Sequence, residues 1–80
     1  MKLPRDISAK NLIKELKKIG YQETRQIGSH IRLSISLNDK FFHITIPNHN
    51  PIKIGTLNNI LKEISCQLSI PKDELIKKLF

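Results

Sequence analysis

The amino-acid sequence predicts an α+β fold in which helices cover one face of a three-stranded antiparallel sheet. Near the N-terminus, apolar residues recur at helical spacing behind a residue that can cap a helix. Two central segments alternate apolar and polar side chains, with a two-residue turn between them, as the strands of a hairpin do. Two further segments with helical spacing follow. The expected order is helix, three strands, helix and a short extra C-terminal helix.

The length of 80 residues corresponds to one small domain, residues 1–80, and a chain of this size buries only about 60% of its unfolded surface. With 39% hydrophobic and 26% charged residues, the composition is that of a globular domain rather than a disordered or fibrous chain. No apolar run approaches the roughly 18 residues of a membrane span, and the N-terminus lacks the apolar core of a signal peptide. We therefore expect a cytoplasmic protein.

The charge balance is strongly basic. Fourteen Lys and Arg residues against seven Asp and Glu give a formal charge of +7, and much of the excess lies in residues 1–20. Such a surplus favours a polyanion or an acidic protein as partner. The alternative is that the lysines only form a solvated helix face that keeps a small protein soluble. The basic residues of this segment are Lys2, Arg5, Lys10, Lys14, Lys17 and Lys18.

The first predicted helix begins after Ser8, whose hydroxyl can cap it, and ends at Gly20. Ile7 and Leu12 occupy the two positions of a hydrophobic staple. Most lysines of the segment fall away from the apolar stripe, so the outer face of the helix should be cationic. The stripe consists of Leu12, Ile13, Leu16 and Ile19.

Three strands are expected next, at residues 21–27, 31–37 and 40–46. The first is the weakest match because Glu23 and Arg25 interrupt its apolar alternation. A two-residue turn of Asn38 and Asp39 between the other two strands predicts their register. After Leu37 with Lys40, the covered face pairs Ile35 with Phe42, Leu33 with Ile44 and Ile31 with Ile46, and the open face pairs Ser36 with Phe41, Ser34 with His43 and Arg32 with Thr45.

Residues 47–55, with two prolines, two asparagines and a glycine, are typical of a loop. Thr56 is expected to cap a second helix, and after a break at residues 65–70, Pro71 suits the first turn of a short third helix. Cys66, the one cysteine, has apolar residues two positions to either side, which favours a buried core residue over a nucleophile. The packing stripe of the second helix is Leu57, Ile60, Leu61 and Ile64, and that of the third is Leu75, Ile76 and Leu79.

The stretch GSHIRLSISL, residues 28–37, contains the candidate site. His30 and Arg32 share one parity and should point to the open face, about 7 Å apart along the strand. An imidazole can take and return protons near neutral pH, and a guanidinium can clamp a phosphate. Gly28 would let the backbone approach a ligand closely, and Ser29 could donate hydrogen bonds to a phosphate oxygen.

These groups fit the cleavage of single-stranded RNA. The 2′-hydroxyl is an internal nucleophile, so the reaction needs a base, a cation beside the phosphorane and an acid for the leaving 5′-oxygen. His30 could be the base or the acid, and Arg32, Lys53 or a lysine of the first helix could be the cation. The second proton carrier would be His49 in the loop or His43 on the open face.

Other interpretations of the same residues stay open. A histidine at a strand end is more often a hydrogen-bonded surface residue than a catalyst. The predicted open face offers no carboxylate pair, and three histidines without a tight spacing do not form a convincing metal site. Hydrolysis by two metal ions is therefore disfavoured, and we expect no metal or other cofactor.

Three blocks, LPRDISAKNLIKELKKIGY, RQIGSHIRL and ITIPNHNPIKIGTLNNILKEI, together resemble the HicA (YcfA-like) mRNA interferase toxins of bacterial and archaeal toxin–antitoxin pairs. The resemblance covers roughly residues 3–65. It implies a fold similar to the double-stranded RNA-binding domain, ribonuclease action on mRNA, and the histidine of the G-S-H motif, here His30, as the catalytic residue. It also implies a HicB antitoxin that binds the toxin and blocks its activity. His49 matches a histidine often found in the family's loop.

Two features depart from the family. Ile54 stands where proline is often found, and residues 65–80 are longer than the usual ending, so the resemblance implies nothing about the contacts of that segment. The rival to a nuclease is a non-catalytic RNA-binding module that grips A-form backbone by shape. Such a module should carry its lysines at helix ends, whereas a nuclease needs His30 exposed beside a cation. A purely structural subunit explains neither the charge nor the G-S-H motif.

Overall fold

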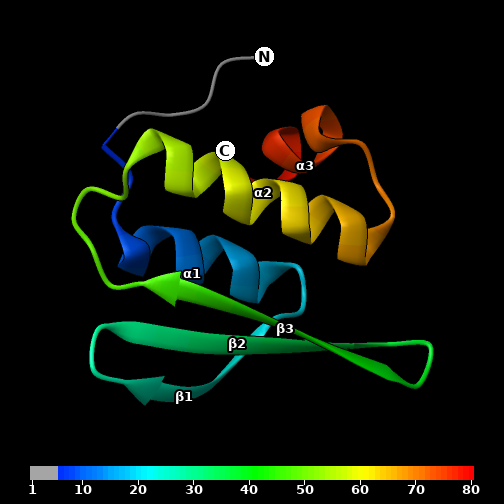
Figure 1. Cartoon of the computed structure of the whole chain (residues 1–80). Helices are drawn as coiled ribbons and strands as arrows, with labels where there is room; N and C mark the ends of the chain where they lie inside the picture. Colours follow the sequence, from blue (N-terminus) through cyan, green and yellow to red (C-terminus); the bar gives the residue numbers. More distant parts are fainter. Residues whose placement is uncertain (1–5) are drawn as a thin grey trace.

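The computed structural model describes residues 6–80, so Lys2 and Arg5 of the basic N-terminal segment lie outside the described residues. Within that range the predicted order of elements is confirmed (Figure 1). The helices lie on the same side of the sheet, and the other face of the sheet is open. The elements are α1 (Ala9–Lys18), β1 (Gln22–Ile27), β2 (His30–Leu37), β3 (Lys40–Pro47), α2 (Ile54–Leu68) and α3 (Lys72–Leu79).

The sheet has the order β1-β2-β3 with antiparallel neighbours, and the predicted register of β2 and β3 is confirmed at every pair. Leu37 pairs with Lys40 across the turn. Asn38 and Asp39 between them have positive φ angles of 50° and 65°. A type I′ turn requires two positive φ values, and Asn and Asp tolerate them better than most residues. The turn therefore fixes which side chains face the helices.

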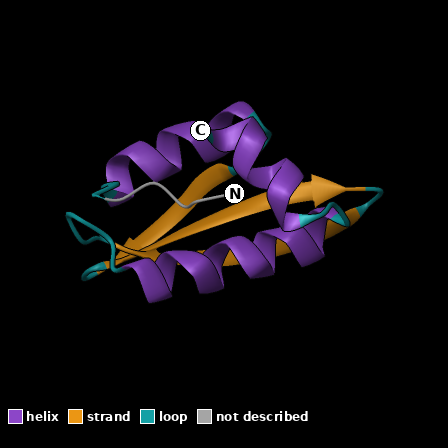
Figure 2. Cartoon of the chain, turned by 90° about the horizontal axis from the view of Figure 1, so that it is seen from above, coloured by secondary structure: helices purple, strands orange, loops and turns teal. Residues whose placement is uncertain are grey.

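Side chains of β2 alternate between the core and solvent. Ile31, Leu33 and Ile35 are buried, whereas His30 and Arg32 are exposed. Full burial of an aliphatic side chain contributes about 1.5–3 kcal/mol, so a slip by one residue would be costly. Figure 2 shows α1 and α2 running along the sheet to form the covering layer. The helices contribute Leu12, Leu16, Leu57, Leu61, Ile64, Leu75 and Leu79 to the core.

Helix α1 begins and ends as the sequence predicts. The Ser8 hydroxyl oxygen accepts a hydrogen bond of 3.1 Å from the Asn11 backbone N–H, which caps the first turn. Past the helix the chain turns through Gly20, whose φ of 117° favours glycine. A Cβ atom at Gly20 would lie 3.3 Å from Ile35 Cδ1. The glycine therefore permits both the turn and the close approach of the chain to β2.

Strand β1 is confirmed and begins at Gln22, after Tyr21, which is only 1% exposed. The six side chains of the strand are all exposed, because it lies at an edge of the sheet with little cover from the helices. A β-bulge between Glu23 and Arg25 shifts its register against β2. The exposure and the bulge together explain why the sequence shows no clean alternation in this segment.

The start of helix α2 differs from the prediction. The helix begins at Ile54 with Lys53 as its N-cap, so the expected cap at Thr56 is wrong. The Lys53 carbonyl oxygen accepts the first helical hydrogen bond, 2.8 Å from the Leu57 nitrogen. No side chain caps this end, and the sequence therefore carries no capping residue that could have marked it.

The end of α2 differs as well, because the helix continues through the predicted break to Leu68. It stops at Ser69, which has a left-handed φ of 55°. Cys66 is exposed, so the prediction of a buried thiol is wrong. Successive residues in an α-helix are turned by about 100°. Positions two apart therefore lie nearly opposite each other, and the burial of Ile64 implies an outward-facing Cys66.

Helix α3 packs on the same core. Pro71 is its N-cap, and the acidic residues come in the first turn and the basic ones in the last, as expected for the helix dipole. Within residues 6–80, no helix has the length and apolar character needed to cross a bilayer. The buried side chains of α3 are Leu75, Ile76 and Leu79.

Candidate nucleic-acid interface

The candidate site begins at the turn between β1 and β2. Ile27 pairs with His30 across a two-residue connection. Its first residue, Gly28, has a φ of 58°, which favours glycine at this position of a tight hairpin turn. A Cβ atom added to Gly28 would meet no atom within 4 Å. The backbone of Gly28 and Ser29 is therefore accessible from solvent immediately before the histidine.

His30 is the first residue of β2, and its side chain is exposed on the open face. It lines a depression of about 210 Å³ together with Arg25, Ile27, Arg32 and Thr45. The imidazole is thus reachable by a ligand and shares its surroundings with two guanidinium groups.

Arg25 is a residue of this site that the sequence reasoning missed. It pairs directly with Arg32 across β1 and β2. Both arginines also line a neighbouring depression of about 310 Å³ that includes Thr24 and His43. Among the described residues, neither depression is lined by a carboxylate. Counting back along the strands from a two-residue turn at Gly28 and Ser29 would have placed the two arginines side by side.

His43 lies on the same face but away from His30. It pairs with Ser34, four residues along β2 from the site, which corresponds to about 13 Å. Proton transfer to one reacting group needs heavy atoms about 3 Å apart. The Gln67 side-chain amide donates a 2.8 Å hydrogen bond to the His43 carbonyl oxygen and ties this strand to α2. The structure therefore does not bring the two histidines to one point.

The loop between β3 and α2 links the turn before β2 to helix α1. The Asn48 N–H donates to the Ser29 carbonyl oxygen at 2.6 Å, and the Ala9 N–H donates to the His49 carbonyl oxygen at 3.0 Å. The second bond satisfies one of the free donors at the start of α1. His49 is exposed and is held next to the turn by these backbone contacts. Lys53, further along the loop, lines neither depression.

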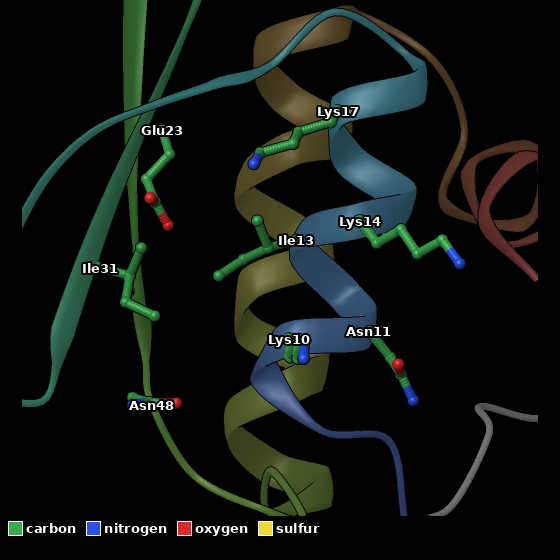
Figure 3. A pocket seen from close by; sticks show the side chains of 8 residues that line it. All are labelled: Lys10, Asn11, Ile13, Lys14, Lys17, Glu23, Ile31 and Asn48. Carbon is green, nitrogen blue, oxygen red and sulfur yellow. The ribbon is translucent and has the colours of Figure 1, made fainter.

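The lysines of α1 occupy a different place from the one proposed for a catalytic cation. Lys10, Lys14 and Lys17 line a groove between α1 and the sheet, on the covered side of the molecule (Figure 3). None of them lines the depressions around His30. Among the described residues, the cations available at the histidine are therefore Arg25 and Arg32.

Two large hydrophobic side chains are exposed on the open face. Phe41 is 70% exposed on β3, opposite Ser36, and Ile27 is 64% exposed beside His30. An exposed aromatic ring on a basic sheet face is a typical platform for stacking of nucleic-acid bases. Among residues 6–80, no group of three His, Cys, Asp or Glu side chains is placed to hold a metal ion.

The fold and the open face define a small basic α+β domain with an accessible histidine and an arginine pair that an anionic partner can contact. The model of a protein family described as the HicA toxin of bacterial toxin–antitoxin systems matches residues 9–65. The chain belongs to this HicA toxin family, and membership makes it a toxin with an antitoxin as partner. Neither the curated proteins nor the solved structures contained a match.

Proposed function

We propose that this toxin is a metal-independent mRNA endoribonuclease of the cytoplasm with His30 as its catalytic residue. A HicB-like antitoxin inhibits it by binding. The observation that supports the proposal is the exposed imidazole in a depression with Arg25 and Arg32 and without a carboxylate. A basic protein of net charge +7 also gains association rate with RNA and with an acidic antitoxin.

The proposed reaction uses the RNA's own 2′-oxygen as nucleophile. This oxygen attacks the adjacent phosphorus, its proton passes to a base, and the bond from phosphorus to the 5′-oxygen breaks as that oxygen takes up a proton. The products are a 2′,3′-cyclic phosphate and a free 5′-hydroxyl. His30 transfers one of the two protons. Arg25 and Arg32 stabilise the negative charge that grows on the phosphorane oxygens, to which a guanidinium can donate two hydrogen bonds at once.

His49 is the better placed second proton carrier. Its loop is hydrogen-bonded to the turn of Gly28 and Ser29 that precedes His30, whereas His43 lies about 13 Å away along the sheet. The turn itself offers exposed backbone and the Ser29 hydroxyl to a phosphate oxygen, as helix and loop amides do in many nucleic-acid complexes. Lys53 follows in the same loop and is assigned to the RNA chain rather than to the reacting phosphate.

The decisive experiment compares wild type, His30→Ala and the matched control His43→Ala on a single-stranded RNA oligonucleotide. His30→Ala should lower the cleavage rate about 100-fold or more, the usual effect of losing a positioned acid or base. Its circular dichroism and its affinity for a 2′-O-methyl oligonucleotide, which cannot be cleaved, should stay close to wild type. His43→Ala should cleave nearly as fast as wild type.

Cleavage that survived in His30→Ala would move the active site elsewhere. A substrate with a 2′-deoxy nucleotide at the scissile position should be inert, and EDTA should leave the rate unchanged. Strong sensitivity to EDTA would instead support a metal-dependent mechanism, and cleavage of the 2′-deoxy substrate would rule out the internal nucleophile.

The second candidate function is a non-catalytic RNA-binding module. It is favoured by Lys10, Lys14 and Lys17 of α1, which form no salt bridge with another described residue. Such a protein would bind the oligonucleotide with a steep salt dependence, and both the wild type and His30→Ala would leave the RNA intact.

A further inference from the structure

A groove runs between α1 and the sheet, on the side away from His30 (Figure 3). Its volume is about 510 Å³, and its floor is formed by Ile13 of α1 and Ile31 of β2. Both floor residues are only 6% exposed. The groove exists because α1 does not extend over the edge strand β1, whose side chains are exposed on both faces. The groove therefore follows from the way α1 packs on the sheet.

The walls of the groove are cationic. Lys10 and Lys17 stand two turns apart on α1, about 10.5 Å along the helix axis, and Lys14 lies between them on the outer rim. Lys17 projects toward the sheet, whereas Lys14 projects away from it (Figure 3). Glu23 of β1 is the one carboxylate among the lining residues. The groove thus carries three lysines against a single acidic group.

These lysines are not used within the described part of the chain. The one salt bridge among residues 6–80 joins Lys18 to Glu15, and no side-chain hydrogen bond involves a lysine of the groove wall. Three unpaired ammonium groups along one groove repel each other slightly and attract an anion of matching length. An extended polyanion that follows the groove and its rim can reach all three, whereas a single small anion reaches only one or two.

The path of the groove connects it with the histidine. Asn48 lines one end, and its N–H donates to the Ser29 carbonyl oxygen in the turn immediately before His30. A strand that leaves the groove at this end meets the exposed backbone of Gly28 and passes onto the open face. The lysine groove and the histidine depression are therefore placed along one continuous route around the β1–β2 turn.

An acidic polypeptide fits the groove less well than RNA. A peptide would gain most by pairing with the free edge of β1, but the bulge between Glu23 and Arg25 interrupts that edge. Bulges and charged side chains are devices that keep edge strands from pairing. Lysines on flexible stems instead act as point charges, which suits phosphates spaced along a mobile strand.

We infer that the groove between α1 and the sheet binds the sugar–phosphate backbone of the RNA next to the nucleotide that His30 cleaves. This inference rests on the proposed function and extends it with a second contact site. Lys10, Lys14 and Lys17 are positioning residues in this arrangement. They hold the strand, and the reacting atoms are touched by residues of the open face.

The test uses the full chain with the three groove lysines changed together, Lys10→Gln, Lys14→Gln and Lys17→Gln. The matched control removes the same charge from exposed positions elsewhere, Lys62→Gln, Lys77→Gln and Lys78→Gln. The probe is a fluorescent single-stranded 2′-O-methyl oligonucleotide, whose binding is followed by anisotropy between 50 and 200 mM salt. Each phosphate contact contributes about 0.7 to the slope of log affinity against log salt.

The groove variant should lose about 2 from this slope. The ratio of wild-type affinity to variant affinity should therefore rise by about 18-fold when the salt is lowered fourfold. The control should keep the wild-type slope, and His30→Ala should bind as wild type does. Rates of RNA cleavage should fall in the groove variant mainly through KM, because the lysines hold the strand and do not touch the reacting phosphate.

Equal slopes for the groove variant and the control would overturn the inference while leaving cleavage by His30 untouched. If the wild type cleaved no RNA but the groove variant still bound the oligonucleotide more weakly than the wild type, the groove would be supported and the nuclease refuted. Poly-L-glutamate serves as the competing probe. If its binding depended on the groove lysines while oligonucleotide binding did not, the groove would belong to an acidic protein and the RNA assignment would be wrong.

Discussion

Replacing Arg25 by Gln should stabilise the free protein while it weakens RNA binding. Arg25 and Arg32 are direct partners across β1 and β2, line the same two depressions, and have no carboxylate beside them there. Like charges directly opposite each other on a sheet are destabilising. The pair is therefore expected to cost folding free energy that only an anionic ligand offsets.

The magnitude follows from the pairing. Side chains of directly opposite residues start about 5 Å apart, and charges about 5 to 7 Å apart in water repel by about 0.6 to 0.8 kcal/mol. Flexible arginines can splay apart, so we expect Arg25→Gln to gain about 0.5 kcal/mol, or about 2–4 °C in Tm. At 1 M salt the Debye length falls to about 3 Å, and the gain should vanish.

Urea unfolding at low and high salt measures the effect, with Arg32→Gln and the double variant completing a mutant cycle. The double variant should gain little unfolding free energy beyond either single variant, because one substitution already removes the repulsion between the two charges. Lys40→Gln, an exposed position at the far end of β3, controls for the change in net charge. A loss of stability in Arg25→Gln at low salt, or a gain that persisted at 1 M salt, would refute the repulsion. The slope of RNA affinity against salt should also fall by about 0.7 for each arginine removed.

Two further predictions concern stability. The buried Tyr21 hydroxyl donates to Gln67 at 2.8 Å, and burial together with nearby Glu63 raises its pKa to about 12 from 10. The folded state therefore holds this proton more tightly than the unfolded state, and between pH 10 and 12 wild type should lose about 2 kcal/mol of unfolding free energy that Tyr21→Phe does not lose. Urea unfolding of both proteins at pH 9 and pH 12 tests this, and parallel losses would contradict it. Leu61→Ala, at a position with no exposed surface, should lower the unfolding free energy by about 2–5 kcal/mol, and a midpoint equal to wild type would mean that the core does not depend on it.

The hairpin of β2 and β3 could be predicted from the sequence because two independent signals agreed. Ile31, Leu33 and Ile35 share one parity, and Asn38 with Asp39 suits a turn that needs two positive φ angles. Parity then placed the alternate side chains of β2, including His30, on the open face, and the structure shows the His30 side chain exposed. Where pattern and turn chemistry coincide, the positions of side chains follow.

The features that could not be predicted lacked this agreement between the apolar pattern and the turn or capping residues. The first turn of α2 begins at the backbone carbonyl of Lys53 and has no capping side chain. The sequence therefore favoured Thr56, a residue type that often caps helices, as the predicted N-cap. Cys66 was predicted to be buried because its neighbours two positions away are apolar. Residues two apart lie on the same face of a strand but on nearly opposite sides of a helix. Arg25 was missed because its strand shows no clean apolar alternation, although the register counted back from the turn at Gly28 and Ser29 pairs it with Arg32.

The family model ends at residue 65, within α2, and α3 lies wholly beyond it. Yet Leu75, Ile76 and Leu79 belong to the same core as the helices and strands within residues 9–65. A shortened protein trimmed to the matching segment would keep His30, Arg32 and the whole sheet, and would leave apolar flanks of α1 and α2 facing water. The segment that matches the family model is therefore shorter than the segment that builds the hydrophobic core.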